Sequence, residues 1–150
     1  MSEAKEELLK LQETGKYVFH GTHKDLTVLS PQQAHNYDGM NQTVDGDPAV
    51  FASSHAEYAI FMAIITEENC PQGYRSGTGM KDGILKFNAT QKTLDQLKDS
   101  AKGWVYVFDR RDFEKRNNAE TEYVAYHVVT PIKRIQVIKD DLPSNIEVKN

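Results

Sequence analysis

The stretch Tyr17-Val18-Phe19-His20-Gly21-Thr22 decides how the rest of the chain is interpreted. It opens with aromatic and β-branched residues, which predict a short buried strand. The strand runs directly into a histidine, a glycine and a threonine. Functional groups are often held where an element of the scaffold ends. The stretch therefore predicts a core strand with a candidate site at its end.

Residue patterns on both sides of this stretch predict further helices and strands. Leucines among charged residues predict a helix over 3–14 that ends at Gly15. Segment 49–52 predicts a second strand, and the apolar run 55–65 predicts a largely buried helix capped by a serine. We expect further strands at 84–87, 104–108, 123–129 and 132–138, and a short helix around Leu94 and Leu97.

Two long segments carry no sustained periodicity. Residues 22–48 are polar and rich in turn residues, so we expect a loop with one helical turn at 31–35. Residues 67–83 contain several glycines and a proline, so we expect a mobile surface loop there. Together the elements predict an α+β fold dominated by an antiparallel or mixed sheet with peripheral helices.

The composition limits the class of protein. The chain has 150 residues, with 18 basic and 22 acidic side chains and one cysteine. We expect a single domain over 1–150, with its core in residues 17–138. One cysteine excludes an internal disulfide and a Cys-rich zinc site, and the net acidity argues against a mainly nucleic-acid-binding protein. Because no long apolar run occurs, we expect no membrane span and a cytoplasmic setting.

Three segments carry a resemblance to a known family. They are His20-Gly21-Thr22 at the end of a strand, Phe51-Ala52 leading into the buried helix, and Glu122-Tyr123-Val124-Ala125-Tyr126. In this order they resemble the ADP-ribosyltransferase superfamily, in its His-Tyr-Glu branch with diphtheria toxin and the poly(ADP-ribose) polymerases. The resemblance implies a split antiparallel or mixed sheet and a site for NAD, which is the substrate, with no metal.

The resemblance also implies roles for the residues at the first strand end. The main-chain N–H and C=O of Gly21 would bond the nicotinamide carboxamide, because a residue without a Cβ lets a ligand approach closely. His20 would bond a ribose hydroxyl of the adenosine half, and Thr22 would add a hydroxyl contact. The structural alternative for His20 is a strand-end histidine whose ring bonds a neighbouring carbonyl.

The aromatic position departs from the family pattern. Ungapped alignment on Phe51-Ala52 places Phe61, rather than a tyrosine, where the family stacks nicotinamide. Tyr58 lies about one helical turn earlier, at the position of a serine that bonds the carboxamide in the polymerases. A phenylalanine keeps the π face and loses the phenol hydrogen bond. Alternatively, Tyr58 and Phe61 are two core residues at helical spacing.

Glu122 is the candidate catalytic carboxylate. Cleavage of the glycosidic bond to nicotinamide passes through a cationic ribose, which a nearby carboxylate stabilises. Glu120 completes a Glu-Thr-Glu pattern similar to that of arginine-directed ADP-ribosyltransferases, in which the first glutamate binds the target guanidinium. Taken alone, the pair is equally well interpreted as two solvated carboxylates ahead of a strand.

The leading hypothesis is a mono-ADP-ribosyltransferase-like domain with NAD and an unidentified acceptor, which is a protein, a nucleic acid, a small molecule or water. One alternative is a degenerate domain of the same fold that binds NAD or a partner protein without transfer. A second is an RNA 2′-phosphotransferase-like enzyme, since that family also carries His-Gly-Thr. A third is an interaction module whose strands mimic the motifs.

Overall fold

The computed structural model describes residues 2–32, 35–38, 41–44, 48–116 and 121–150. Their main feature is a six-stranded sheet in the order β10-β7-β1-β4-β9-β8, in which all neighbours are antiparallel. The α+β class with antiparallel and mixed sheets is thereby confirmed. The strands of this sheet are β1 (Tyr17–Thr22), β4 (Val50–Ser53), β7 (Lys102–Asp109), β8 (Glu114–Lys115), β9 (Glu122–Ala125) and β10 (Lys133–Ile138).

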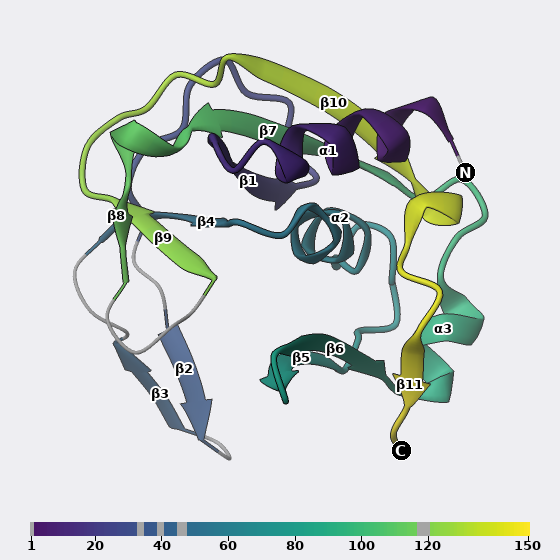
Figure 1. Cartoon of the computed structure of the whole chain (residues 1–150). Coiled ribbons are helices and arrows are strands. Elements are labelled where there is room, and N and C mark those ends of the chain that lie inside the picture. The colour runs from purple at the N-terminus through teal and green to yellow at the C-terminus, as the bar shows by residue number, and fades with distance from the viewer. Residues whose placement is uncertain (1, 33–34, 39–40, 45–47, 117–120) are drawn as a thin grey trace.

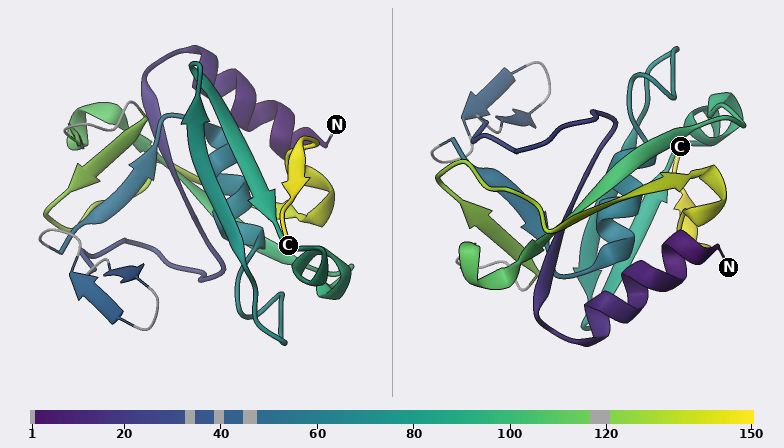
Figure 2. Two further views of the ribbon diagram at one scale, coloured as in Figure 1. Left: turned by 90° about the horizontal axis from the view of Figure 1, so that it is seen from below. Right: turned by 90° about the horizontal axis from the view of Figure 1, so that it is seen from above.

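A smaller mixed sheet lies on the other side of the central helix (Figure 1). Its order is β11-β6-β5, with β11 parallel to β6. Its edge strand β5 lies on the side that faces β4 and β9 (Figure 2, left). A two-stranded hairpin, β2-β3, stands apart. These strands are β2 (His35–Asp38), β3 (Asn41–Val44), β5 (Ser76–Lys81), β6 (Ile84–Ala89) and β11 (Ile146–Val148).

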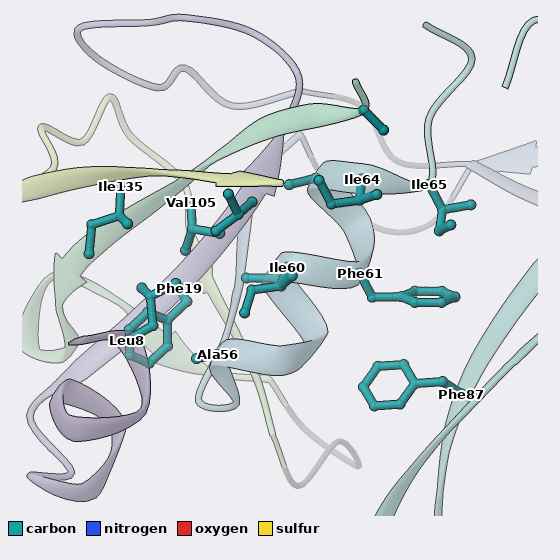
Figure 3. Packing of buried hydrophobic residues seen from close by; sticks show 14 of the residues in the cluster. Leu8, Phe19, Ala56, Ile60, Phe61, Ile64, Ile65, Phe87, Val105 and Ile135 are labelled. Carbon is teal, nitrogen blue, oxygen red and sulfur yellow. The ribbon is translucent and has the colours of Figure 1, made fainter. Parts of the chain in front are cut away.

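The described residues also form the helices α1 (Glu3–Glu13), α2 (Ala56–Ile64) and α3 (Gln91–Gln96), with short 3-10 turns at Arg110–Asp112 and Lys139–Asp141. Helix α2 lies between the two sheets and is buried on most of its circumference, as its apolar composition predicts. Its side chains join those of α1 and β1 in the main core (Figure 3). In the described part of the chain, no helix is both long and apolar enough to cross a membrane.

Two glycines allow α2 to lie directly on the large sheet. A Cβ on Gly21 of β1 would lie 1.8 Å from the carbonyl oxygen of Ala59, and one on Gly103 of β7 would lie 2.4 Å from that of Ala63. Ala59 and Ala63 are one turn apart and carry the smallest side chains of the helix interior. The close approach of backbone to backbone fixes the position of α2, and with it the position of Tyr58.

The start of α2 differs from the sequence-based expectation. The N-cap residue is His55, whose side chain makes no capping bond, so the expected serine cap is wrong. Instead, the Gln12 side chain of α1 accepts the Ala56 N–H at 2.8 Å through Oε1. A residue distant in sequence therefore satisfies one of the free N–H groups of the first turn.

Two of the expected loops contain strands. His35 begins β2 and Gln32 bridges Ala49, so the helical turn expected at 31–35 is wrong, although 33–34 lie outside the described residues. Within the loop expected at 67–83, β5 forms a hairpin with β6. The two-residue turn has φ values of 55° at Asp82 and 77° at Gly83, which is typical of the type I′ turns that join tightly paired strands.

Candidate functional site

The large sheet opens between β1 and β4. Across the described residues, the ladder between these strands consists of the single pair Phe19↔Ser53. At the next residue of β1, the ring of His20 bridges the two strands, with its Nδ1 2.5 Å from the carbonyl oxygen of Phe51. A side chain thus takes the place of main-chain pairing, and β1 continues beyond it without pairing to β4.

The main chain of Gly21 points into this opening. In antiparallel sheets, both polar groups of a residue point to the same neighbouring strand, and successive residues alternate. The Val107 carbonyl accepts the Ile132 N–H at 2.9 Å on the β10 side of β7. Phe19, the partner of Val107 on β1, therefore directs its own N–H and C=O toward β4. Two residues later, Gly21 directs its N–H and C=O the same way.

His20 is held in its neutral form. Because a carbonyl oxygen only accepts hydrogen bonds, Nδ1 carries the hydrogen in the contact with Phe51. Burial lowers the pKa of His20 below its ordinary value, and the bond to the Phe51 carbonyl acts in the opposite direction. The neutral ring therefore leaves Nε2 as a hydrogen-bond acceptor. This geometry matches the structural alternative for His20, and the same ring also lines the cavity described next.

We expect the buried His20 to make stability depend on pH. Its folded pKa lies below the ordinary 6.5, so the unfolded chain binds more protons in the interval between the two pKa values. The free energy of unfolding should therefore fall as the pH drops below 6.5, by at most about 1.4 kcal/mol per pH unit. Urea unfolding between about pH 8 and about pH 5 measures this slope.

The matched variants for this measurement are His20→Gln and His127→Gln, since His127 is exposed. The first should flatten the pH dependence and the second should preserve it. If wild type and His20→Gln show the same slope, His20 is not the group responsible.

A cavity of about 360 Å³ occupies the opening between the two sheets. Four of the residues expected at a site line it: His20, Gly21, Tyr58 and Glu122. Strand β5 contributes one wall, which the sequence analysis had interpreted as part of a loop. The remaining lining is mainly apolar and consists of Phe19, Phe51, Ala52, Met62, Met80 and Leu85, with Ser53, Thr78, Gly79 and Thr121.

Glu122 begins β9 opposite Ser53 of β4. Its Oε1 accepts a hydrogen bond from Nη1 of Arg116 at 2.9 Å, and its main-chain carbonyl accepts the Arg116 N–H at the same distance. The Glu122 side chain is 35% exposed and that of Arg116 28%. The carboxylate is therefore ion-paired and half-buried, and Oε2 remains able to accept further hydrogen bonds.

Tyr58 of α2 lines the cavity, and the charge of Glu122 acts on its phenol. Burial raises the pKa of the Tyr58 phenol, the negative charge of Glu122 raises it further, and a hydrogen bond with the Thr78 side chain acts in the opposite direction. The phenol therefore stays protonated. Thr78 of β5 lines the same cavity, so α2 and β5 each contribute a hydroxyl-bearing side chain to its wall.

Two of the other expected site residues, Phe61 and Thr22, do not line this cavity. Phe61 is 1% exposed and packs against Phe87, with ring centroids 5.0 Å apart (Figure 3). Phe61 is therefore a core residue, as in the alternative interpretation, and it is not positioned to stack on a ligand in this cavity. Thr22 lines a neighbouring cavity of about 290 Å³, which it shares with His20 and Phe51. Glu120 lies outside the described residues.

Two residues that the sequence analysis did not name as site residues, Phe51 and Arg116, contact predicted site residues. Phe51 provides the carbonyl that holds His20 and lines both cavities. Arg116 forms an ion pair with Glu122. Its six-residue separation from Glu122 carried no signal, because the pairing depends on the β8–β9 hairpin. Over the described ranges, no three His, Cys, Asp or Glu side chains cluster in a way that could hold a metal ion.

Comparison of the chain with models of known protein families, with curated proteins and with solved structures finds no match.

Proposed function

We propose that this chain is an NAD-dependent ADP-ribosyltransferase-like enzyme that cleaves the glycosidic bond to nicotinamide. The observation that carries the proposal is the common cavity: the Gly21 main chain, His20, Tyr58 and Glu122 surround it, although they come from β1, α2 and β9. The opening of the sheet between β1 and β4 is consistent with the split sheet of that family. Under this proposal, the site binds NAD as a substrate.

The nicotinamide half fits the cavity by its chemistry. A carboxamide needs one donor and one acceptor side by side, and the N–H and C=O of Gly21 supply both at an unpaired strand edge. The apolar side chains around them would accommodate the ring, with Phe51 offering an aromatic face. Tyr58 would bond the carboxamide or the ribose through its hydroxyl.

The adenosine half would extend past His20 into the second cavity. His20 lines both cavities, so under this proposal its Nε2 would accept a hydrogen bond from a ribose hydroxyl. Thr22 and Lys24 line the second cavity and would add a hydroxyl and a positive charge, the latter for the pyrophosphate.

Glu122 would act on the bond that breaks. The bond between the ribose anomeric carbon and the nicotinamide nitrogen cleaves with both electrons passing to nicotinamide, which leaves as a neutral molecule. Glu122 would stabilise the positive charge that develops on the ribose and accept a ribose hydroxyl. The acceptor then forms a bond to the anomeric carbon and loses its proton to Glu122 or solvent.

The deciding experiment incubates the purified chain with NAD, alone and with cell lysate, and follows free nicotinamide. We expect release of nicotinamide, and transfer of labelled ADP-ribose to a lysate component. If no nicotinamide appears while NAD still raises the melting temperature, the chain is a binding domain without transfer. The ion pair of Arg116 with Glu122 is the observation that favours this second function, because it partly neutralises the carboxylate. If NAD neither yields free nicotinamide nor raises the melting temperature, both functions are refuted.

Replacing Tyr58 with phenylalanine should weaken NAD binding by up to about 10-fold, which corresponds to the loss of one hydrogen bond. The ring and its packing on α2 are retained, so the fold should persist. Calorimetric titration with NAD measures the change. Tyr126→Phe is the control, because Tyr126 is 54% exposed and does not line the cavity. Equal affinities in the two variants would remove Tyr58 from the binding site.

A further inference from the structure

We propose that Arg116 is the positioning residue for Glu122, supported in turn by the ring of Phe51. The inference rests on the proposed function, in which Glu122 is the catalytic carboxylate. Arg116 follows β8 directly and contacts Glu122 twice, through its main chain and through its guanidinium, both at 2.9 Å. The main-chain bond fixes the position of the Arg116 backbone relative to Glu122, and the side-chain bond fixes the position of the Glu122 carboxylate.

The guanidinium is itself held in place. Its central carbon lies 5.3 Å from the centroid of the Phe51 ring, within the range of a cation–π contact. The Arg116 side chain is 28% exposed, whereas that of Arg111, which lies a short way earlier in the chain, is 90% exposed. A planar guanidinium with an aromatic support loses less freedom when it binds a carboxylate than a flexible ammonium would.

Phe51 thereby connects the two side chains on which the proposed reaction depends. Its carbonyl accepts a hydrogen bond from His20, and its ring supports the arginine that holds Glu122. Both contacts originate from one residue of β4, at the point where β1 and β4 separate. The relative placement of His20 and Glu122 is therefore set through Phe51, although neither is near it in the sequence.

Arg116 has two opposing effects on the reaction rate: its charge should lower the rate, and its placement of the Glu122 carboxylate should raise it. The distance over which each effect acts decides which is larger. The positive charge of Arg116 weakens the field of Glu122 at the ribose, but both side chains reach solvent, which screens this effect. The placement of the carboxylate acts at contact distance, where a displacement of about 1 Å can lower the rate about 100-fold. We therefore expect loss of Arg116 to slow the reaction.

The test compares Arg116→Gln, Arg116→Lys and Arg116→Ala with Arg111→Gln as the matched control. In steady-state assays of nicotinamide release, Arg116→Gln should lower kcat about 10- to 100-fold and leave the KM for NAD within about twofold. Arg116→Lys should lie between wild type and Arg116→Gln, because it keeps the charge without the planar fork. Arg111→Gln should match wild type.

Chemical rescue separates positioning from a general structural role. Millimolar guanidinium chloride should restore part of the kcat of Arg116→Ala, and equal concentrations of sodium chloride or urea should not. The proposal is overturned if Arg116→Gln is as fast as wild type or faster, if only KM changes, or if guanidinium restores nothing.

Failure of the proposed function is distinguishable from failure of this inference. If wild type releases no nicotinamide, the proposed function fails first, and crystal structures of wild type and Arg116→Gln then decide the positioning claim. The claim expects Glu122 to turn away from the cavity in the variant. A Glu122 carboxylate in the same place in both crystals overturns it.

Discussion

Glu122→Gln is expected to slow nicotinamide release by about 10²- to 10³-fold while the affinity for NAD changes little. Glutamine has nearly the same shape and still accepts a hydrogen bond, but it carries no charge. Under the proposed function, the lost interaction is made mainly with the cationic transition state, so kcat should fall and NAD binding should be retained. Free nicotinamide reports kcat, and calorimetric titration reports NAD binding.

Glu114→Gln provides the matched control. Glu114 is exposed and lies on the neighbouring strand β8, opposite Val124 of β9. It does not line the cavity, so its loss should leave both the rate and the affinity unchanged. A Glu122→Gln variant with wild-type kcat would refute the catalytic role of this carboxylate. A variant that loses NAD affinity to the same extent as kcat would make Glu122 a binding residue.

Gly21→Ala is expected to destabilise the fold by about 3 kcal/mol or more, or to prevent folding. The added methyl group would lie 1.8 Å from the carbonyl oxygen of Ala59 and 2.7 Å from its carbon. These are backbone atoms of α2, so no side-chain rotation relieves the clash, and the helix must move away from the sheet. Urea unfolding monitored by circular dichroism measures the change.

Gly79→Ala is the control for this prediction. Gly79 lines the same cavity, and a Cβ there would meet nothing within 4 Å. It should lower stability by much less than Gly21→Ala. Near-equal stability of Gly21→Ala and wild type would contradict the described packing of α2 on β1.

The packing of Gly21 against α2 gives a different reason for a glycine at position 21 than the resemblance does. The resemblance implied that the missing side chain lets the ligand approach. In the structure, the missing side chain faces α2, and the main-chain N–H and C=O point into the opening toward β4. A substitution of Gly21 therefore tests the fold before it tests the ligand site, and a Gly21→Val variant does not isolate ligand binding.

Periodic patterns predicted most elements of the fold. The helix expected over 3–14 is α1, and the strand expected from Tyr17 is β1, which continues to Thr22. In both segments the pattern and the final burial agree, because the same side chains that favour the element also fill the core. The segments where the pattern was silent, 22–48 and 67–83, contain the hairpin β2-β3 and strand β5.

Strand β5 shows why a polar, glycine-rich strand escapes prediction. Most of its residues are exposed, so its composition carries no record of a buried face. It is a strand because the turn at Asp82 and Gly83 folds it back onto β6. The parallel pairing of β11 with β6 was missed for a related reason, since its partner lies nearly sixty residues away in the chain.

The sequence by itself determined the α+β class, the strand that carries His20 and Gly21, and Glu122 as the candidate carboxylate. These features depend on local propensity and on the types of residue that the chemistry needs. Only the tertiary structure decided that Tyr58 lines the cavity while Phe61 fills the core, that Gly21 faces α2, and that Phe51 contacts His20 while Arg116 pairs with Glu122. Each of these depends on which strands become neighbours, and long-range pairing leaves almost no trace in a local pattern of side chains.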